Sequence, residues 1–226
     1  IIVPGVPVIY DGNNPKAAKV IREHAVELGS PYYEVRKSDS EIIRNTRSGI
    51  DFSFKNGYYD NTVFSIPFIA GYQVMNSSLA LQTIQVLKEQ IPVSEDALKK
   101  GLSETRWQGR METVLPGVIV DGAHNEDGVA KFVETAAHFQ EEYPLNLLFS
   151  AVDDKDYTEM ISTILGKIHF RHVVVTQVGG YRKVPAEKLA EIFREHGVPT
   201  AECCENVPEA FHRALAEKGK DGLLFC

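Results

Sequence analysis

Two short segments bring a cation, a carboxylate and an imidazole close together along the chain. The first reads W-Q-G-R-M-E at positions 107–112 and contains Arg110. The second reads D-G-A-H-N at positions 121–125 and contains Asp121 and His124. A guanidinium can bind two phosphate oxygens at once, and carboxylate and imidazole groups can bind hydroxyl groups or move protons. These residue types predict a ligand site that suits an anion.

The elements around these segments place them at the edge of a sheet. The apolar residues 118–120 follow Pro116-Gly117 and predict a buried strand, so residues 121–125 form the loop that leads into a helix. Asn125 suits the N-cap of that helix. In an open α/β sheet, ligands bind beyond the carboxyl ends of the strands, and a helix start offers free N–H groups to anions.

Strand-like and helix-like segments alternate through the second half of the chain. This alternation predicts right-handed crossovers and a mostly parallel, Rossmann-like sheet with flanking helices. No G-x-G-x-x-G fingerprint is present, and Gly179-Gly180 is interpreted as a surface turn. The expected strands are 118–120, 145–149, 172–176, 200–203 and 223–226, and the expected helices are 126–140, 157–165, 186–196 and 208–217.

The first half of the chain predicts a separate α/β domain. Its expected elements are a strand at 6–10, a helix at 15–28, an antiparallel ribbon of 51–54 and 58–64 turning at Asn56-Gly57, and helices at 72–88 and 94–102. Polar residues and glycine interrupt the pattern at 103–109. We therefore expect two domains, at residues 1–104 and 105–226.

Composition excludes several classes of function. The chain is 43% hydrophobic and 24% charged, which is ordinary for a globular enzyme. A net charge of -7 argues against a nucleic-acid partner, and no apolar run approaches the ~20 residues that span a bilayer. The three cysteines have neither a paired framework nor metal-ligand spacing. We expect a cytoplasmic protein without a membrane partner or a metal site formed by these residues.

The two segments at 107–112 and 121–125 resemble the start of the C-terminal domain of the Mur ligase superfamily, most closely its folylpolyglutamate synthase and dihydrofolate synthase branch. That branch shows W-P-G-R-x-E and D-G-A-H-N, and Gln108 replaces a common proline here. Residues 71–80 resemble the family's G-x-H-Q-x-x-N-x-x-x-A helix start, with Tyr72 where histidine is usual. Residues 150–156 resemble the family's strand end followed by D-K-D.

The resemblance covers nearly all of this chain but only about half of a family member. No G-x-x-x-x-G-K-[ST] phosphate loop occurs, and residues 1–8 resemble a segment that follows it in the family. Residues 1–104 are therefore expected to be the C-terminal part of the central ATPase domain, and residues 105–226 the C-terminal domain, truncated at its end. Such a chain is expected to be inactive alone.

The resemblance implies a role for each candidate residue. Arg110 would contact nucleotide phosphate, Asp121 the ribose hydroxyls, and Asn76 the adenine edge. His124 would orient substrate near the acyl phosphate and the incoming glutamate, as the catalytic candidate. Without the resemblance, these residues are as readily a solvated arginine, a helix cap, a packed amide and a histidine bonded to backbone. The substrate-binding candidates are His124, Lys155, Asp156 and Arg182, although Asp153 and Asp154 could simply cap a helix and Arg182 could lie in a solvated basic loop.

The implied activity is an ADP-forming carboxylate–amine ligase that uses ATP and Mg²⁺. ATP would convert a carboxylate of folate or dihydropteroate into an acyl phosphate, and the amine of L-glutamate would then displace phosphate. Positioning three substrates and excluding water are the main tasks in such chemistry. Two alternatives stay open: a cell-wall Mur-type amino-acid ligase, and a non-catalytic nucleotide- or ligand-binding module.

Overall fold

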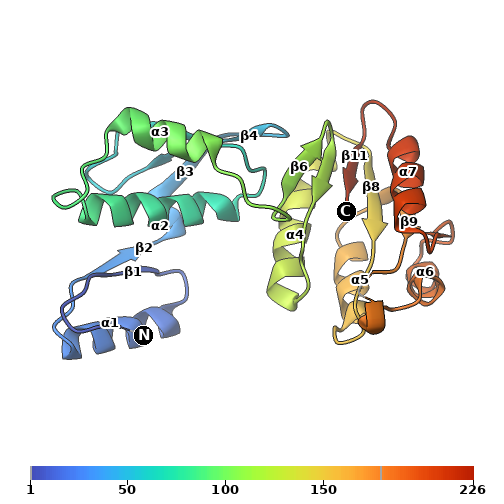
Figure 1. The fold of residues 1–226 in the computed structure, drawn as a ribbon, viewed down its shortest axis with the longest axis horizontal. Coiled ribbons are helices and arrows are strands. Elements are labelled where there is room, and N and C mark those ends of the chain that lie inside the picture. The colour runs from blue at the N-terminus through green and yellow to red at the C-terminus, as the bar shows by residue number, and fades with distance from the viewer. Residues whose placement is uncertain (1, 179) are drawn as a thin grey trace. The chain divides into compact units, whose positions relative to one another are not determined.

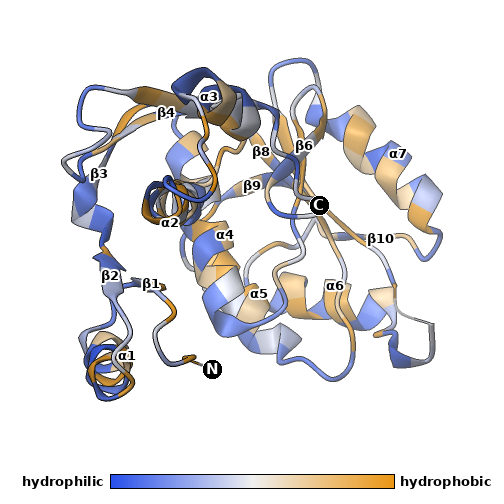
Figure 2. Cartoon of the chain, turned by 60° about the vertical axis from the view of Figure 1, so that its left-hand side comes forward, coloured by the Kyte–Doolittle hydropathy of each residue, from blue (hydrophilic) through white to orange (hydrophobic). Residues whose placement is uncertain are grey.

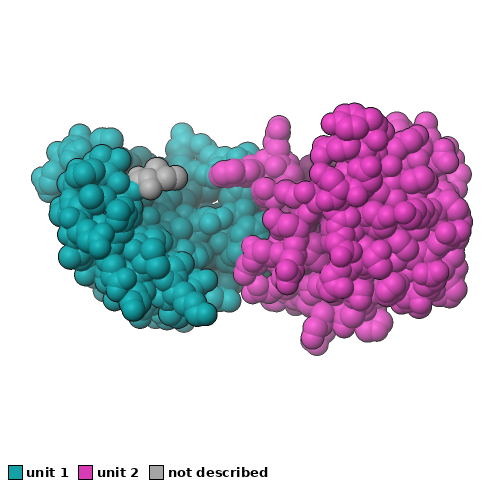
Figure 3. Space-filling view, turned by 90° about the horizontal axis from the view of Figure 1, so that it is seen from below, with its two compact units in different colours: residues 1–106 teal, residues 107–226 magenta. Residues whose placement is uncertain are grey.

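The computed structural model of the protein describes residues 2–178 and 180–226. The chain divides into two compact units, Ile1–Arg106 and Trp107–Cys226, which Figure 3 colours separately. Ile1, in the opening segment, and Gly179, in the expected Gly179-Gly180 turn, lie outside the described residues. No helix in the described part of the chain combines the length and apolar character needed to cross a membrane.

Unit 1 begins with a parallel β-α-β motif, drawn in dark blue in Figure 1. Strand β1 (Val8–Asp11), helix α1 (Pro15–Glu27) and strand β2 (Tyr32–Val35) follow one another, and Val8 lies opposite Tyr32. The side chain of Asn14 accepts hydrogen bonds from the backbone N–H groups of Lys16 and Ala17, which caps α1. The helix lies within one residue of its predicted bounds, while β1 begins two residues after the expected start and β2 was not predicted.

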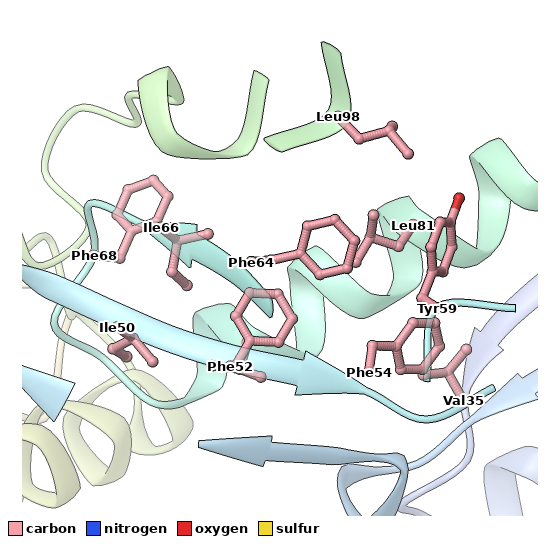
Figure 4. Close-up of a cluster of buried hydrophobic side chains, with 11 residues drawn as sticks. Val35, Ile50, Phe52, Phe54, Tyr59, Phe64, Ile66, Phe68, Leu81 and Leu98 are labelled. Carbon is pink, nitrogen blue, oxygen red and sulfur yellow. The ribbon is translucent and has the colours of Figure 1, made fainter. Parts of the chain in front are cut away.

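The rest of unit 1 is an antiparallel sheet covered by helices. The sheet has the order β3-β4-β5, formed by β3 (Ser40–Thr46), β4 (Gly49–Phe54) and β5 (Val63–Ile66). Helix α2 (Tyr72–Val86) contacts both sheets of the unit, and α3 (Glu95–Glu104) contacts β5. Figure 4 shows the buried cluster between them, which consists of Val35, Ile50, Phe52, Phe54, Tyr59, Phe64, Ile66, Phe68, Val74, Leu81 and Leu98.

The predicted ribbon is antiparallel as expected, but its turn was placed wrongly. Asn56-Gly57 does not join the two strands directly, because β5 begins only at Val63. The side chain of Asn56 instead accepts hydrogen bonds from the N–H groups of Tyr58 and Tyr59, at 3.1 and 3.0 Å. This local turn directs Tyr59 into the core, where it is 4% exposed. The two-residue connection lies between β3 and β4, and β3 itself was not predicted.

Unit 2 is a six-stranded, mostly parallel sheet of the predicted Rossmann-like kind. Its order is β10-β9-β8-β11-β7-β6, and every neighbouring pair is parallel except β6 and β7. The elements are β6 (Glu112–Leu115), β7 (Val118–Val120), α4 (Glu126–Phe139), β8 (Leu145–Phe149), α5 (Tyr157–Leu165), β9 (Phe170–Val175), α6 (Ala186–Glu195), β10 (Glu202–Cys203), α7 (Val207–Lys218) and β11 (Leu223–Phe225). All the predicted strands and helices of this half are present, and β6 is the one strand that was missed.

The crossovers place helices on both faces of this sheet. The chain runs from β7 through β8 and β9 to β10 in one direction, and then returns through α7 to β11. With right-handed crossovers, α4, α5 and α6 therefore cover one face and α7 covers the other (Figure 2). Helix α7 contacts β8, β9 and β11 over the buried residues Val118, Val174, Cys204, Ala210, Ala214 and Leu224.

Candidate functional site

A hairpin brings the two chemically interesting segments of unit 2 together. Strands β6 and β7 pair antiparallel with Glu112 opposite Val120, so the turn before β6 lies against the loop after β7. The backbone N–H of Gly122 donates to the carbonyl of Gly109 at 2.8 Å. The N–H of Gly109 in turn donates to Oε2 of Glu112 at 3.0 Å. The strand pairing and the bond between Gly122 and Gly109 therefore connect two segments that are separated in the sequence.

Asp121 lies at the centre of this arrangement. Its Oδ2 accepts a hydrogen bond from the N–H of Met111, and its Oδ1 accepts one from the N–H of Ala123, both at 2.9 Å. Its own N–H donates to the carbonyl of Cys226 at the end of β11. Met111 is fully buried with a φ of 48°, a left-handed conformation that costs about 1 kcal/mol or more for a residue with a side chain. The bond to Asp121 and the burial of Met111 offset that cost.

The environment of Asp121 acts on its protonation in two directions. Burial raises the pKa of Asp121 above its ordinary value, because a charged carboxylate loses hydration there. The N–H groups of Met111 and Ala123 and the charges of Arg110 and His124 lower the pKa of Asp121, but not enough to cancel the effect of burial. A carboxylate has about four acceptor positions, so the two backbone bonds leave Asp121 able to accept further hydrogen bonds.

Helix α4 begins beside this carboxylate and is capped by Asn125, as predicted. The Oδ1 of Asn125 accepts a hydrogen bond from the N–H of Gly128 at 2.8 Å. Asp121 is therefore not the cap of this helix. It organises the loop before the cap.

His124 is exposed, and its ring orientation is fixed by the backbone. Its Nδ1 lies 2.7 Å from the carbonyl oxygen of Gly122. A carbonyl only accepts, so we assign the proton of the neutral ring to Nδ1, which leaves Nε2 as an acceptor. The sequence left open whether His124 merely bonds to neighbouring backbone or also binds substrate, and this bond to the backbone is present. The same bond also leaves Nε2 available for a ligand.

Arg110 is exposed on the turn before β6. Its positive charge lowers the pKa of Asp121, which places the guanidinium near that carboxylate. No hydrogen bond or salt bridge joins its guanidinium to another of the described residues. Arg110 is thus a cation beside the loop that retains its donors.

A second group of charged residues lies at the carboxyl ends of β8 and β9. The loops after these strands are joined, since Val152 pairs with Lys183 and the N–H of Asp153 donates to the carbonyl of Arg182 at 2.8 Å. Nη1 of Arg182 lies 3.0 Å from Oδ2 of Asp154, and Nζ of Lys155 lies 4.0 Å from the same oxygen. The predicted cations are therefore brought together.

Both groups lie at one edge of the sheet of unit 2. In the sheet, β8 is the neighbour of β11, and β11 is the neighbour of β7. Two strand spacings, or about 10 Å, therefore separate the end of β7 from the end of β8. The Asp121 loop and the Lys155–Arg182 group are near enough for one ligand complex to contact both.

Asp156 has a different local role from its neighbours. Its Oδ1 accepts a hydrogen bond from the N–H of Glu159 at 3.0 Å, which makes it the N-cap of α5. The expectation that Asp153 or Asp154 would cap this helix was wrong. Asp154 is instead bonded to Arg182.

Asn76 belongs to unit 1 and lies within α2. It is the fifth residue of that helix, so it does not cap it. Its Nδ2 donates to Oε1 of Gln73 at 2.9 Å, and Gln73 is buried whereas Asn76 is exposed. The amide of Asn76 is held by its neighbour one turn earlier and faces solvent.

The described residues do not provide a metal centre of their own. Among them, no group of three or more histidine, cysteine, aspartate or glutamate side chains could hold a metal ion. Mg²⁺ is commonly bound by one or two carboxylates together with substrate phosphates and water, so none of the described residues is assigned to it here.

Sequence reasoning missed two residues that shape these groups. Met111 supplies the N–H that fixes Asp121, and nothing in an apolar side chain indicates such a backbone role. Asp154 holds two cations, and its only signal was its place in a D-D-K-D run. Strand β6 could have been found from the turn at Pro116-Gly117, since the β-branched residues Thr113 and Val114 just before it favour a strand.

The mostly parallel sheet and its two helical layers define a Rossmann-like α/β domain (Figure 1). The family model described as "Mur ligase, glutamate ligase domain" matches residues 109–226. The chain therefore belongs to the Mur ligase family and contains its glutamate ligase domain.

Known proteins of similar sequence and structure agree with this membership. The dihydrofolate synthase/folylpolyglutamate synthase of Bacillus subtilis is 35% identical over 180 residues, which are 75% of this chain and 41% of the relative. The crystal structure of the Thermotoga maritima folylpolyglutamate synthase has a TM-score of 0.79 at 24% identity, over 99% of this chain and 52% of that one. The chain thus spans about half the length of these relatives.

A further solved structure contains bound ligands. It is a bifunctional folylpolyglutamate synthase/dihydrofolate synthase with Mn, AMPPNP and L-glutamate, and it has a TM-score of 0.70 at 21% identity, over 99% of this chain and 50% of that one. At this identity, the likeness establishes the shared fold.

Proposed function

We propose that this chain is part of an ADP-forming ligase that adds L-glutamate to a carboxylate of folate or dihydropteroate, at the expense of ATP. The observation that carries this proposal is the loop at 107–125, in which a family-like sequence forms a fixed turn at the carboxyl edge of the glutamate ligase domain. Relatives with folylpolyglutamate and dihydrofolate synthase names support the choice of substrate.

In this proposal, Arg110 and Asp121 bind the nucleotide. Arg110 has an exposed guanidinium suited to two phosphate oxygens. Asp121 keeps acceptor positions beyond those used by Met111 and Ala123, and these can take ribose hydroxyl groups. Asn76, on α2 of unit 1, has an exposed amide suited to the donor and acceptor pattern of an adenine edge.

His124 is the proposed catalytic and substrate-orienting residue. With Nδ1 donating to the Gly122 carbonyl, Nε2 can accept a hydrogen bond from the glutamate amine. This contact would orient the nitrogen lone pair toward the acyl carbon. Because the ring is anchored to the backbone, little side-chain entropy is lost when substrate binds.

Lys155 and Arg182 are the proposed contacts for a substrate carboxylate. They come from the loops after adjacent strands, and the backbone bonds between these loops fix their spacing. Asp156 supports them by capping α5 immediately after Lys155. This single bond leaves Asp156 with further acceptor positions, which can take an N–H group of the substrate.

The chemistry requires activation because hydroxide is a poor leaving group from a carboxylate at neutral pH. Transfer of the γ-phosphoryl group of ATP gives an acyl phosphate and ADP. The glutamate nitrogen then attacks the acyl carbon, the carbon–oxygen bond to phosphate breaks, and the amine loses a proton. A divalent cation would neutralise charge on the phosphates when bound. The contribution of this chain is to bind and orient the reactants.

The test is incorporation of labelled L-glutamate into dihydropteroate and tetrahydrofolate, using the protein made from its complete natural reading frame. We expect ATP-dependent incorporation by the wild type. His124→Ala and Asp121→Asn should each lower the rate by about 100-fold or more, the usual range for a lost catalytic or electrostatic contact. Circular dichroism of each variant confirms that it is folded.

Two outcomes would contradict the proposal. A folded complete protein that incorporates no glutamate into either acceptor is not a folate ligase. Full activity in both variants would move the site away from the Asp121 loop. The 226-residue chain alone should show no turnover, because its sequence contains no phosphate loop.

A further inference from the structure

The carboxylate of Asp154 occupies the position between the two cations that a ligand carboxylate would be expected to take. Its Oδ2 lies 3.0 Å from Nη1 of Arg182 and 4.0 Å from Nζ of Lys155. The hydrogen bond to Arg182 is charge-assisted, which is how a guanidinium binds any carboxylate. Asp154 therefore has the same chemistry as the carboxylate of an amino acid.

The backbones of the two loops are joined independently of Asp154. The pairing of Val152 with Lys183 and the bond from Asp153 N–H to the Arg182 carbonyl join the two loops through the backbone. On the following helices, Nζ of Lys188 lies 5.4 Å from the centre of the Tyr157 ring. The site would keep its shape if the side chain of Asp154 rotated away.

The ion pairs of Asp154 are weak enough to exchange. The side chains of Asp154, Arg182 and Lys155 are 45%, 47% and 34% exposed. Exposed ion pairs of this kind contribute little to stability, because water competes for both charges. A ligand carboxylate can therefore replace Asp154 at a small cost in energy.

We infer that Asp154 is an internal stand-in for the carboxylate of the ligand, and that the ligand displaces it from Arg182 and Lys155. The inference rests on the proposed function in one respect, namely that these two cations bind a substrate carboxylate. It makes Asp154 a residue that sets affinity and selectivity, because every anion that enters must compete with it.

The charges of the group favour a monoanion over a phosphate. Asp153 and Asp154 counter much of the positive charge of Lys155, Arg182 and Lys183. A carboxylate that displaces Asp154 leaves the net charge on the cations unchanged. A dianion would add a further negative charge close to both aspartates, which is unfavourable.

The test is a titration of the isotope-labelled 226-residue chain with L-glutamate, followed by NMR on the side-chain Nε–H of Arg182. Asp154→Asn removes the competing charge and keeps the shape. Asp153→Asn is the matched control, because it removes the same charge one residue earlier and the Asp153 side chain has no hydrogen bond to another described residue. Inorganic phosphate is the second probe.

We expect Asp154→Asn to bind L-glutamate about fivefold more tightly than the wild type, which corresponds to removal of an exposed ion pair. Asp153→Asn should change the affinity by less than about twofold, and phosphate should bind the wild type more weakly than L-glutamate. Unchanged or weaker binding in Asp154→Asn, an equal gain in both variants, or no shift of the Arg182 signal in any of the proteins would overturn the inference.

The result is separable from the glutamate-incorporation assay. If L-glutamate binds as expected while the complete protein incorporates none, the proposed function fails and the stand-in role of Asp154 survives. If incorporation occurs and Asp154→Asn behaves like Asp153→Asn, only the stand-in role fails.

Discussion

The Asp121 loop and the Asp154 group lie at the same edge of one sheet, yet they hold their carboxylates in opposite ways. Asp121 is partly buried and bonded to two backbone N–H groups, so the loop would lose its shape without it. Asp154 is exposed and bonded only to side chains, so it can move without disturbing the backbone. The first arrangement suits a fixed binding surface, and the second suits an exchangeable contact.

The largest expected difference between the two carboxylates is in stability. Asp121→Ala removes the hydrogen-bond acceptor for the N–H groups of Met111, which is fully buried, and of Ala123. Each N–H group left without an acceptor costs about 1–3 kcal/mol. We therefore expect a loss of about 2–6 kcal/mol in the free energy of unfolding. Asp154→Ala should cost about 1 kcal/mol or less.

Urea denaturation of both variants measures this difference. Unfolding is monitored by signals from unit 2, because the two units need not unfold together. Equal losses in the two variants would show that both carboxylates are held alike.

A second difference concerns pH. The pKa of Asp121 is raised in the folded chain by burial, so the folded state binds its proton more readily than the unfolded state. Its contribution to stability is therefore greatest below the ordinary value of 3.8 and is lost as pH rises through the higher folded pKa. Relative to Asp121→Asn, the wild type should become more stable as pH falls through this window.

Carbon-13 NMR of the aspartate carboxyl groups gives the midpoint of Asp121 directly. A midpoint at or below the ordinary value would contradict the effect of burial. Asp121→Asn identifies the signal by its disappearance.

The support given to Lys155 by helix capping should be smaller and local. Asp156→Ala removes the acceptor for the N–H of Glu159 and should lower stability by about 1 kcal/mol. Asp156→Asn keeps a capping oxygen and should retain most of the stability that the cap provides. A loss as large in the asparagine variant, measured by the same denaturation, would mean that Asp156 acts through its charge.

The smallest expected effect is that of salt. Raising ionic strength from about 0.05 to 0.5 M shortens the screening length and should weaken the Asp154–Arg182 pair by a fraction of 1 kcal/mol. The hydrogen bonds of Asp121 to backbone should respond little. Hydrogen exchange at Arg182 Nη1 and at the Met111 N–H measures the two interactions in one experiment. Equal acceleration of exchange at both groups would contradict this expectation.

The alternation of strands and helices in unit 2 could be predicted from sequence because apolar periodicity is strong in a buried parallel sheet. Strand β6 was missed since it lies at the edge of the sheet, with most of its residues exposed. In unit 1, Asn56-Gly57 indicated a tight hairpin, but the packing of Tyr59 in the core favours a longer loop. Tertiary packing overrode the local signal there.

Sequence also indicated which parts of the site lie together, but not how they are held. Arg110, Asp121 and His124 were noted for their types and spacing and were given roles by the family resemblance, and the hairpin places their segments side by side. The bond from Met111 N–H to Asp121 depends on a left-handed backbone at Met111, which its side chain does not favour. The shared contact of Asp154 depends on a loop 28 residues away, at Arg182.

The most direct test maps two ligands on the complete protein by NMR, with labelled histidine and arginine side chains. A fixed nucleotide loop beside an exchangeable carboxylate site predicts that ADP shifts the signals of His124 and Arg110, while L-glutamate shifts Arg182 most strongly. The account would be contradicted if only ADP shifted the Arg182 signal, or if L-glutamate shifted the Arg110 signal and no other. Either result would mean that the two loops do not bind separate ligands.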